Sequence, residues 1–375
     1  MTERTTLTDL PAMEVGARAD RVRARLADAG VDALLVTRLP NVRYLTGFTG
    51  SAGLVLLGAD SSDPMLLVTD GRYAEQSRAQ VAAAGVTADV AIGSTQAEQR
   101  DALVAAAAPF PRLGLEAHGV TWGQVRDYES WFADHELVPT EELVEAERRI
   151  KEAAEVARIR AACAIADDAL GELLPTLADG PTERDFALEL EFAMRRRGAT
   201  KTSFDPIVAA GPNGALPHAR PSARRIERGE LVVIDFGCIV DGYCSDMTRT
   251  VSVGDPGIEA TRVWETVLAS QQAGRDAVGP GVECAAVDHA SRAVIDDAGW
   301  ADAFVHGTGH GVGLEIHEAP RVARTASGTL APGYVVTVEP GVYLPGVGGV
   351  RIEDTLVVTD DSAVALTEFP KQLIL

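Results

Sequence analysis

LVVIDFGCIVDGYCSDMTRTVSVG, residues 231–254, decides how the C-terminal part of this chain folds. It reads as two strands joined at Asp241-Gly242, a dipeptide typical of tight hairpin turns. Asp235 and Asp246 then become cross-strand or diagonal neighbours within apolar strands. Each aspartate alone could be an ordinary turn or strand-end residue. Because two facing carboxylates repel each other, the pair favours ligation of a cation.

A second stretch, VVTVEPGVYLPGVGGVRIEDTLVV at residues 335–358, repeats this pattern. One strand ends at Glu339, and a Gly-rich turn leads back into a strand that carries Glu353, so the two glutamates can meet across the hairpin. Side chains alternate along a strand, so Arg351 and Glu353 face one way and Asp354 faces the other. We therefore predict Glu353 as a metal ligand, and Asp354 as a residue behind the ligands or at the surface.

Three histidines stand within HGTGHGVGLEIHEAP, residues 306–320. His306, His310 and His317 are three of the seven histidines in the chain, and core packing does not explain such a concentration. The glycines around His310 allow a close approach of the backbone. Glycines also occur in phosphate-binding loops, but the Lys-Ser/Thr that follows in such loops is missing. The chain also lacks an H-E-x-x-H helix, which makes a thermolysin-like single-zinc site a poor interpretation.

His218 lies in a Pro/Gly-rich segment, GPNGALPHARPS at residues 211–222. Such loops carry function more often than core residues do. On sequence alone, a functional histidine and an exposed loop histidine are equally good interpretations.

Carboxylates in β-branched, apolar segments are costly to bury unless a cation neutralises them. Four carboxylates and one imidazole favour Mn²⁺ or Co²⁺, and Zn²⁺ also fits. Two such ions would share a hydroxide and stabilise the oxyanion of a carbonyl under attack, so we predict metal-assisted hydrolysis of an amide or ester. The predicted ligands are, in chain order, Asp235, Asp246, His310, Glu339 and Glu353.

Composition sets further bounds. The chain has 375 residues and a formal net charge of −21, which argues against nucleic acid or an anionic membrane surface as a partner. We see neither a secretory signal nor an apolar run of about 20 residues, so we expect a cytoplasmic protein. The four cysteines lack a C-x-x-C spacing and are expected to be free thiols.

The length predicts two domains. We expect their boundary near residues 140–150, which gives domains at residues 1–145 and 146–375. The first alternates strands and helices and is of the α/β class, whereas the second is α+β with a largely antiparallel sheet. Residues 141–179 give the longest helical signal, which ends at Gly180-Pro181. The positions of further elements follow from periodicity. We predict helices near 20–30, from 72, and at 182–197, 256–278 and 283–299, with early strands at 31–37, 53–57 and 65–69.

The five ligand segments resemble, in identity, order and spacing, those of the "pita-bread" metallopeptidases, the family of methionine aminopeptidase, aminopeptidase P and prolidase. The resemblance covers about residues 150–375, and the first 140 or so residues are similar to the creatinase/prolidase N-terminal domain. It implies a curved, largely antiparallel sheet in the catalytic domain, two divalent metal ions and, commonly, a homodimer.

The same resemblance implies roles for the ligands. Asp235 would chelate one ion, Asp246 and Glu353 would bridge both, and His310 and Glu339 would hold the second. Glu339 also resembles the general base of the family.

Four further positions match residues near the family's site. His218, His306 and His317 correspond to histidines that bind substrate or stabilise the tetrahedral intermediate, and Arg351 corresponds to an arginine beside the ligands.

Three segments place the chain within the family. NVRYLTGFTGS (41–51), TDGRYAEQ (69–76) and residues 200–222 look like those of short bacterial aminopeptidase P. We therefore predict an Xaa-Pro aminopeptidase that acts on short peptides with proline in second position. Xaa-Pro dipeptidase (prolidase) is the alternative. A metal-free binding module is a remote one, since relatives of that kind lack some of the five ligands.

Overall fold

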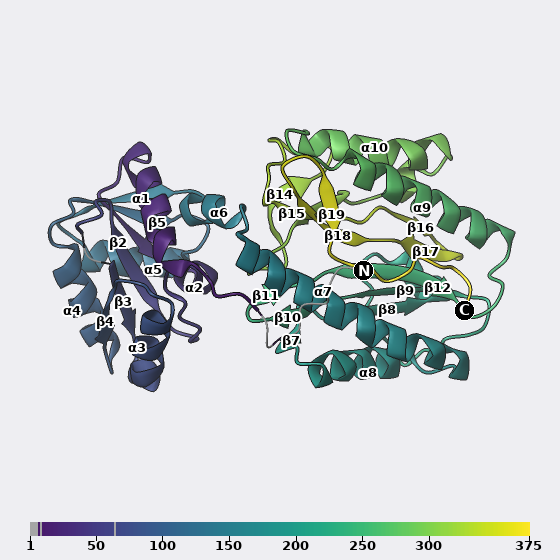
Figure 1. The fold of residues 1–375 in the computed structure, drawn as a ribbon, viewed down its shortest axis with the longest axis horizontal. Coiled ribbons are helices and arrows are strands. Elements are labelled where there is room, and N and C mark those ends of the chain that lie inside the picture. The colour runs from purple at the N-terminus through teal and green to yellow at the C-terminus, as the bar shows by residue number, and fades with distance from the viewer. Residues whose placement is uncertain (1–6, 8–9, 64) are drawn as a thin grey trace. The chain divides into compact units, whose positions relative to one another are not determined.

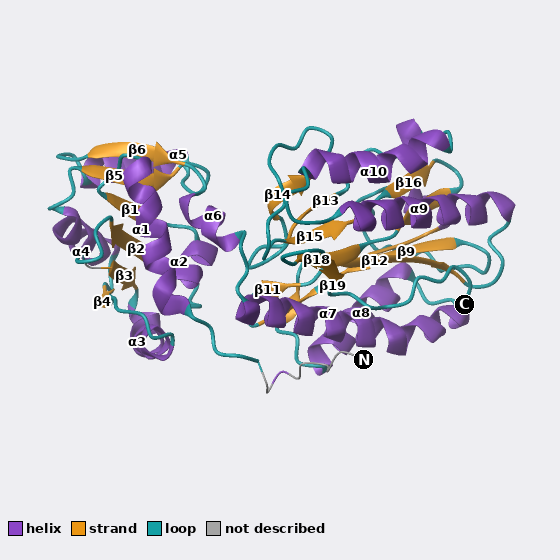
Figure 2. Cartoon of the chain, turned by 45° about the horizontal axis from the view of Figure 1, so that its top comes forward, coloured by secondary structure: helices purple, strands orange, loops and turns teal. Residues whose placement is uncertain are grey.

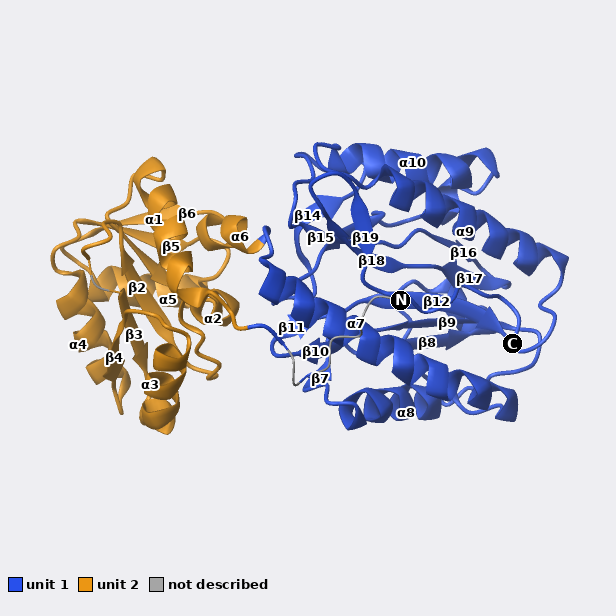
Figure 3. Ribbon diagram, in the orientation of Figure 1, with its two compact units in different colours: residues 1–11, 149–375 blue, residues 12–148 orange. Residues whose placement is uncertain are grey.

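The computed structural model describes residues 7, 10–63 and 65–375 (Figures 1 and 2). It divides into two compact units, coloured separately in Figure 3: residues 12–148, and residues 149–375 with the first eleven positions. The boundary expected after residue 145 falls inside helix α6 (Leu143–Arg148). In the described ranges, no helix is both long and apolar enough to cross a membrane.

The N-terminal unit is built on one six-stranded mixed sheet. Its strands are β1 (Ala33–Val36), β2 (Leu54–Gly58), β3 (Met65–Thr69), β4 (Asp89–Ile92), β5 (Arg112–Glu116) and β6 (Glu136–Thr140). Its other helices are α1 (Arg18–Asp28), α2 (Leu39–Thr46), α3 (Ala74–Ala83), α4 (Gln96–Ala107) and α5 (Trp122–Trp131). The strand order is β4-β3-β2-β1-β5-β6, with parallel pairs at β3/β4, β1/β5 and β5/β6. Central strands that are apolar on both faces, such as the fully buried β1, form such a helix-covered sheet.

The second unit holds short antiparallel ladders. Its strands are β7 (Lys201–Thr202), β8 (Ile207–Ala210), β9 (Leu231–Phe236), β10 (Cys238–Val240), β11 (Tyr243–Cys244), β12 (Met247–Ser252), β13 (Gly309–Gly311), β14 (Glu318–Val322), β15 (Val335–Val338), β16 (Gly341–Leu344), β17 (Gly348–Arg351), β18 (Asp354–Val358) and β19 (Ala363–Ala365). Two ladders matter for the site: β12-β9-β8 and β14-β13-β15-β18-β19. The predicted α/β plus antiparallel α+β class is confirmed.

Two helix pairs cover these strands from two sides (Figures 1 and 2). They are α7 (Ala153–Leu173) with α8 (Glu183–Arg196), and α9 (Ile258–Ala277) with α10 (Cys284–Asp297). The first pair shares an apolar core with β8, β9 and β12, and α9 shares another with β16 and β17. All four cysteines are free and buried.

The long helical signal at 141–179 is not one helix, and this expectation is wrong. Helix α6 ends at Arg148, and α7 begins only after Glu152, which has extended backbone and forms a reciprocal capping box with Glu155. The Lys151 N–H bonds to the carbonyl of Gly333 and is thereby lost to any helix. Tertiary hydrogen bonding and a cap thus override the local periodicity.

The first predicted hairpin forms, but its two strands belong to two sheets. The part near the turn is the β10/β11 pair, and the part beyond Gly237 is the β9/β12 pair. Asp241 and Gly242 both have positive φ, at 42° and 80°, and make its two-residue turn. At Gly237 a β-carbon would lie 1.9 Å from the carbonyl oxygen of Ser245, so the strands can cross there only because that residue is glycine. Beyond the crossing, Asp235 pairs with Thr248, which makes Asp246 its diagonal neighbour.

The second hairpin has one continuous register. Val338 pairs with Asp354 in the β15/β18 ladder, and Gly341 pairs with Arg351 in the β16/β17 ladder. The same register places Glu339 opposite Glu353, at the junction between the two ladders. The predicted meeting of these two glutamates is therefore confirmed.

Candidate active site

One cavity of about 350 Å³ in the second unit gathers its histidines and carboxylates of interest. It lies where the two hairpins, the His-rich segment and the loop around His218 converge. It is lined by all nine residues that the sequence singles out: Asp235, Asp246, His310, Glu339, Glu353, His218, His306, His317 and Arg351.

The most buried ligand candidates form a compact group. Asp246 and Glu353 are 5% and 1% exposed. Together with His310 they offer ligand atoms that all lie within 4.8 Å of one another. Asp235 and Glu339 are half-buried and line the same cavity. This is a spacing at which one cation can contact several side chains.

His310 is oriented for ligation. Its Nδ1 lies 3.0 Å from the Gly311 carbonyl and so carries the proton, which leaves the Nε2 lone pair free. Nε2 is 3.5 Å from an Asp246 oxygen and 3.4 Å from a Glu339 oxygen. Burial lowers the pKa of His310 to about 4, so the ring is neutral near pH 7 and can act as a ligand.

The four carboxylates of the predicted ligand set share one buried arginine, so they do not each have a cationic partner. Burial, and then the charge of Glu353 and Asp235, raise the pKa of Asp246 well above its usual range. Burial also raises the pKa of Glu339 to about 8 and that of Glu353 well above its ordinary value. Among the described residues, Asp235 Oδ1 and Glu353 Oε1 are buried without a hydrogen-bond partner. Unsatisfied buried oxygens of this kind fit divalent cations.

Arg351 is the buried arginine of the cavity, and each of its three nitrogens donates a hydrogen bond. Nη2 lies 2.5 Å from Asp235 Oδ2, Nη1 donates to the Tyr343 hydroxyl at 2.7 Å, and Nε donates to Thr248 Oγ1 at 3.1 Å. The Tyr343 hydroxyl is also 2.9 Å from His306 Nε2. The sequence analysis missed Tyr343, whose place in a Gly-rich hairpin gave no signal.

The remaining histidines differ in exposure. His306 is held by Tyr343, and burial lowers its pKa to about 4. His317 is exposed and stacks edge-on against His310, with ring centroids 4.4 Å apart. His218 is exposed at the cavity. The sequence analysis also missed the apolar part of the wall, which includes Phe204, Ile207 and Ile316.

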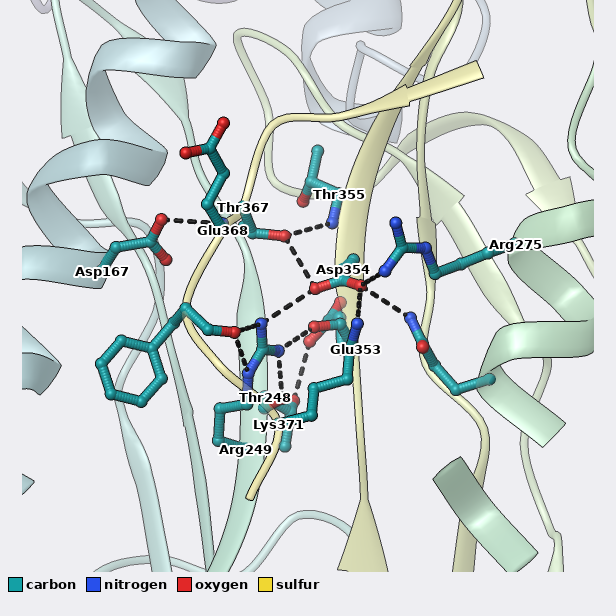
Figure 4. Close-up of polar contacts among 12 residues, drawn as sticks. Asp167, Thr248, Arg249, Arg275, Glu353, Asp354, Thr355, Thr367, Glu368 and Lys371 are labelled. Atoms are coloured by element: carbon teal, nitrogen blue, oxygen red, sulfur yellow. Dashed lines mark hydrogen bonds and ion pairs between the residues drawn. The ribbon is translucent and has the colours of Figure 1, made fainter. Parts of the chain in front are cut away.

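Asp354 faces away from the cavity, as strand alternation predicts, but it is not at the surface. Its side chain is 1% exposed and lies among Arg249, Arg275 and Lys371 (Figure 4). These charges lower the pKa of Asp354 to about 2, against the effect of its burial. The surface alternative is therefore wrong, because partners distant in sequence make burial of the carboxylate affordable.

The fold and the site together define a metal-dependent peptidase. Residues 157–360 match the model of metallopeptidase family M24, and residues 18–150 match the creatinase/prolidase N-terminal domain. The chain belongs to metallopeptidase family M24.

Relatives of full length support this assignment. The chain is 41% identical to "Uncharacterized peptidase YqhT" of Bacillus subtilis, over 96% of this chain and 99% of that one. The solved structure of the Xaa-Pro dipeptidase from Bacillus anthracis is similar with a TM-score of 0.91 and 38% identity, over 96% and 99% of the two chains. An X-Pro aminopeptidase from Thermotoga maritima gives a TM-score of 0.84 and 33% identity, over 94% and 99%.

Proposed function

We propose that this chain hydrolyses the peptide bond before proline at the N-terminus of short peptides, with two divalent metal ions. The observation that carries the proposal is the convergence of four carboxylates and one neutral imidazole on one cavity with a single buried arginine. Mn²⁺ is the first ion to supply, since carboxylate-rich sites favour hard cations, and Co²⁺ and Zn²⁺ are the alternatives.

The five ligands divide by position. Asp235 and Asp246 come from the first hairpin, Glu339 and Glu353 from the second, and His310 from β13. Asp246 and Glu353, the two most buried carboxylates of the set, are the best placed to be shared between two ions. Bound ions would supply an activated water and would stabilise the oxyanion of the scissile carbonyl.

The remaining residues of the site hold substrate and protons. Glu339 lies beside His310 and is the candidate for accepting a proton from the attacking water. His317 and His218 are exposed at the cavity and can donate hydrogen bonds to a substrate carbonyl. Arg351 is held by Asp235 and Tyr343, so we assign it to orienting Asp235 and not to binding substrate.

An apolar wall supports proline as the residue after the cleaved bond. Phe204, Ile207 and Ile316 present hydrocarbon to the cavity, which suits the pyrrolidine ring. The nitrogen of an Xaa-Pro bond carries no hydrogen, so the site needs no acceptor for it. The solved structures of an Xaa-Pro dipeptidase and an X-Pro aminopeptidase are similar to this chain over 96% and 94% of its length.

Two substrate lengths remain in competition, each with an observation in its favour. A dipeptidase must bind the proline carboxylate, and the engaged donors of Arg351 favour an aminopeptidase that accepts longer peptides. Arg220, exposed on the cavity lining, is a cation that a dipeptide carboxylate could reach, and it favours a dipeptidase. We retain the aminopeptidase as the first proposal and the dipeptidase as the second.

The test compares kcat/KM for Ala-Pro, Ala-Pro-Ala and Ala-Ala with Mn²⁺ supplied, and then after chelation. We expect chelator-sensitive cleavage of both proline peptides, with the tripeptide cleaved at least as well as the dipeptide. Cleavage confined to Ala-Pro, and lost in Arg220→Ala, would establish the dipeptidase instead. Failure to cleave either proline peptide with Mn²⁺, Co²⁺ or Zn²⁺ would contradict the proposed function.

A further inference from the structure

A buried cationic cluster lies on the face of β18 that points away from the cavity (Figure 4). Asp354 accepts hydrogen bonds from Arg249 and Thr367 at one carboxylate oxygen, and from Arg275 and Gln271 at the other. The Lys371 ammonium lies 2.5 Å from that second oxygen. Three cations therefore surround one carboxylate, and the proposed chemistry uses none of them.

Arg249 differs from the other two cations because it also contacts the strand segment that carries Glu353. Its Nη1 donates to the carbonyls of Thr248 and Glu353, and its Nη2 donates to Asp354. Nε and Nη2 both donate to the carbonyl of Phe369. The side chain is 2% exposed. A planar guanidinium with five fixed donors can serve four acceptors in this way, and an ammonium cannot.

This arrangement matters because the ligand set is divided between two ladders. Asp235 and Asp246 belong to the β9/β12 side, whereas Glu353 immediately precedes β18 in the other ladder. Several hydrogen bonds tie the two sides together at the ligands, including those from Arg351 to Asp235 and Thr248. The Glu353 N–H donates to the Thr248 carbonyl at 3.1 Å, Thr248 Oγ1 donates to Glu353 Oε2 at 2.7 Å, and Thr355 Oγ1 donates to the Asp246 carbonyl at 2.8 Å.

We propose that Arg249, anchored by Asp354, is a positioning residue that fixes Glu353 relative to Asp246 and so sets the spacing of the metal site. The inference rests on the proposed function, since it takes Glu353 and Asp246 as ligands. Arg249 bridges the backbone of β12 and the Glu353 carbonyl from behind the site, and it is not among the residues that line the cavity.

The C-terminal segment completes the anchor. The Phe369 carbonyl accepts two hydrogen bonds from Arg249, Thr367 donates to Asp354 at 3.0 Å, and Lys371 pairs with the same carboxylate. The Leu366 N–H donates to the Thr355 carbonyl at 2.8 Å. Segment 366–371 therefore holds Arg249 and Asp354 in the orientation that reaches Glu353.

The test measures Mn²⁺ binding by calorimetry, together with kcat and KM, in Arg249→Met, Arg249→Lys and the matched control Arg275→Met. Arg275 contacts the same carboxylate but makes no contact with Glu353 in the described residues. We expect Arg249→Met to raise the Mn²⁺ dissociation constant by about 10- to 100-fold and to lower kcat with KM little changed, as loss of a partner behind a ligand typically does. Arg249→Lys should recover only part of this loss, and Arg275→Met should stay within about twofold of wild type.

Three outcomes would overturn the proposal. The first is wild-type Mn²⁺ affinity in Arg249→Met, and the second is an equal loss of affinity in Arg275→Met. The third is full recovery in Arg249→Lys, which would mean that the positive charge, and not the bridging hydrogen bonds, is the cause. If Arg249→Met does not fold, Asp354→Asn removes the anchor and is expected to weaken Mn²⁺ binding, with wild-type affinity counting against the proposal. Absence of Mn²⁺, Co²⁺ and Zn²⁺ binding by the wild type would instead refute the proposed function.

Discussion

Glu353 and Asp354 are neighbours in sequence, and they lie in opposite electrostatic surroundings. Glu353 faces three other carboxylates and one buried arginine, and burial raises its pKa well above the usual range. Asp354 faces two arginines and a lysine, which lower its pKa to about 2. Both carboxylates are almost completely buried. Three cationic side chains neutralise Asp354. The carboxylates around Glu353 carry excess negative charge, which a bound metal ion would neutralise.

One charge cluster is neutralised within the folded chain, whereas the other fits an added cation. A buried carboxylate with fixed cationic partners is satisfied in the folded chain and has little capacity left for an added ion. A group of buried carboxylates with unpaired oxygens stores an unfavourable interaction that an incoming cation relieves. Four carboxylates beside one buried arginine, with unpaired oxygens on Asp235 and Glu353, mark the face that we propose to bind metal.

Removing a carboxylate from the negative face, which Asp235, Asp246, Glu339 and Glu353 form at the cavity, should have the largest effect. We expect Asp246→Ala and Glu353→Ala each to lose at least one Mn²⁺ per chain and to reduce kcat by roughly 10³-fold or more, beyond the loss of a single stabilising donor. Metal content of the purified variants and turnover of Ala-Pro-Ala check this. Asp205→Ala, an exposed carboxylate on the same cavity, should keep its metal. A variant with two ions and near wild-type rate would refute the ligand assignment.

Variants of the exposed His218 and His317 test whether these residues bind substrate or metal. We expect His317→Ala and His218→Ala to retain Mn²⁺ and to lose about 10²–10³ in kcat, because they would donate hydrogen bonds to substrate and not to the ions. Metal analysis and turnover distinguish the two roles. His289→Ala, an exposed histidine on α10, is the matched control. A metal-free His317 or His218 variant would place that residue among the ligands.

A smaller effect is expected at the link between Arg351 and His306. Tyr343→Phe removes the hydroxyl that bonds both side chains, while the ring and its packing remain. We expect kcat to fall roughly tenfold with Mn²⁺ affinity unchanged, in line with the loss of one hydrogen bond to a charged group. Tyr334→Phe, in the apolar cluster around α10, should be neutral. An unchanged kcat in Tyr343→Phe would show that Arg351 and His306 are held without the hydroxyl.

The sequence predicted how the carboxylates of the cavity come together because they lie in two hairpins with turn signals. Asp241-Gly242 fixes the first turn, and strand alternation correctly turned Asp354 away from Glu353. Local patterns of this kind bring residues together across a few positions. The assignment of each ligand to an ion stays a prediction.

The positive face, which Arg249, Arg275 and Lys371 form around Asp354, was not predictable in the same way. Asp354 meets Arg249, Arg275 and Lys371, which are 105, 79 and 17 positions away by their residue numbers. No sequence periodicity or turn motif links these residues. The sequence analysis therefore could not decide whether Asp354 lies at the surface or is buried behind the ligands. The break before α7 was missed for the same reason, since the Lys151 N–H is bonded by Gly333.

The smallest prediction concerns Asp167, at the edge of the positive face (Figure 4). One of its oxygens accepts the Glu368 N–H at 2.8 Å, and the other is buried without a hydrogen-bond partner in the described chain. Burial raises the pKa of Asp167 to about 6, although the charge of Arg249 opposes the shift. The folded state therefore binds the proton more tightly than the unfolded state does, and its ionisation destabilises the fold.

The sign of the resulting pH dependence follows from that shift. This contribution leaves the folded state most stable below the unfolded pKa of about 4, and the free energy of unfolding falls as the pH rises to about 6. Asp167→Asn keeps an acceptor for the Glu368 N–H and cannot ionise. We expect it to raise the free energy of unfolding by about 1–3 kcal/mol at pH 7.5 and to have little effect at pH 4. Urea unfolding at both pH values measures the difference, with exposed Asp179→Asn as the control. A pH-independent effect, or a loss of stability at pH 7.5, would mean that Arg249 compensates the Asp167 charge fully and that the positive face extends to α7.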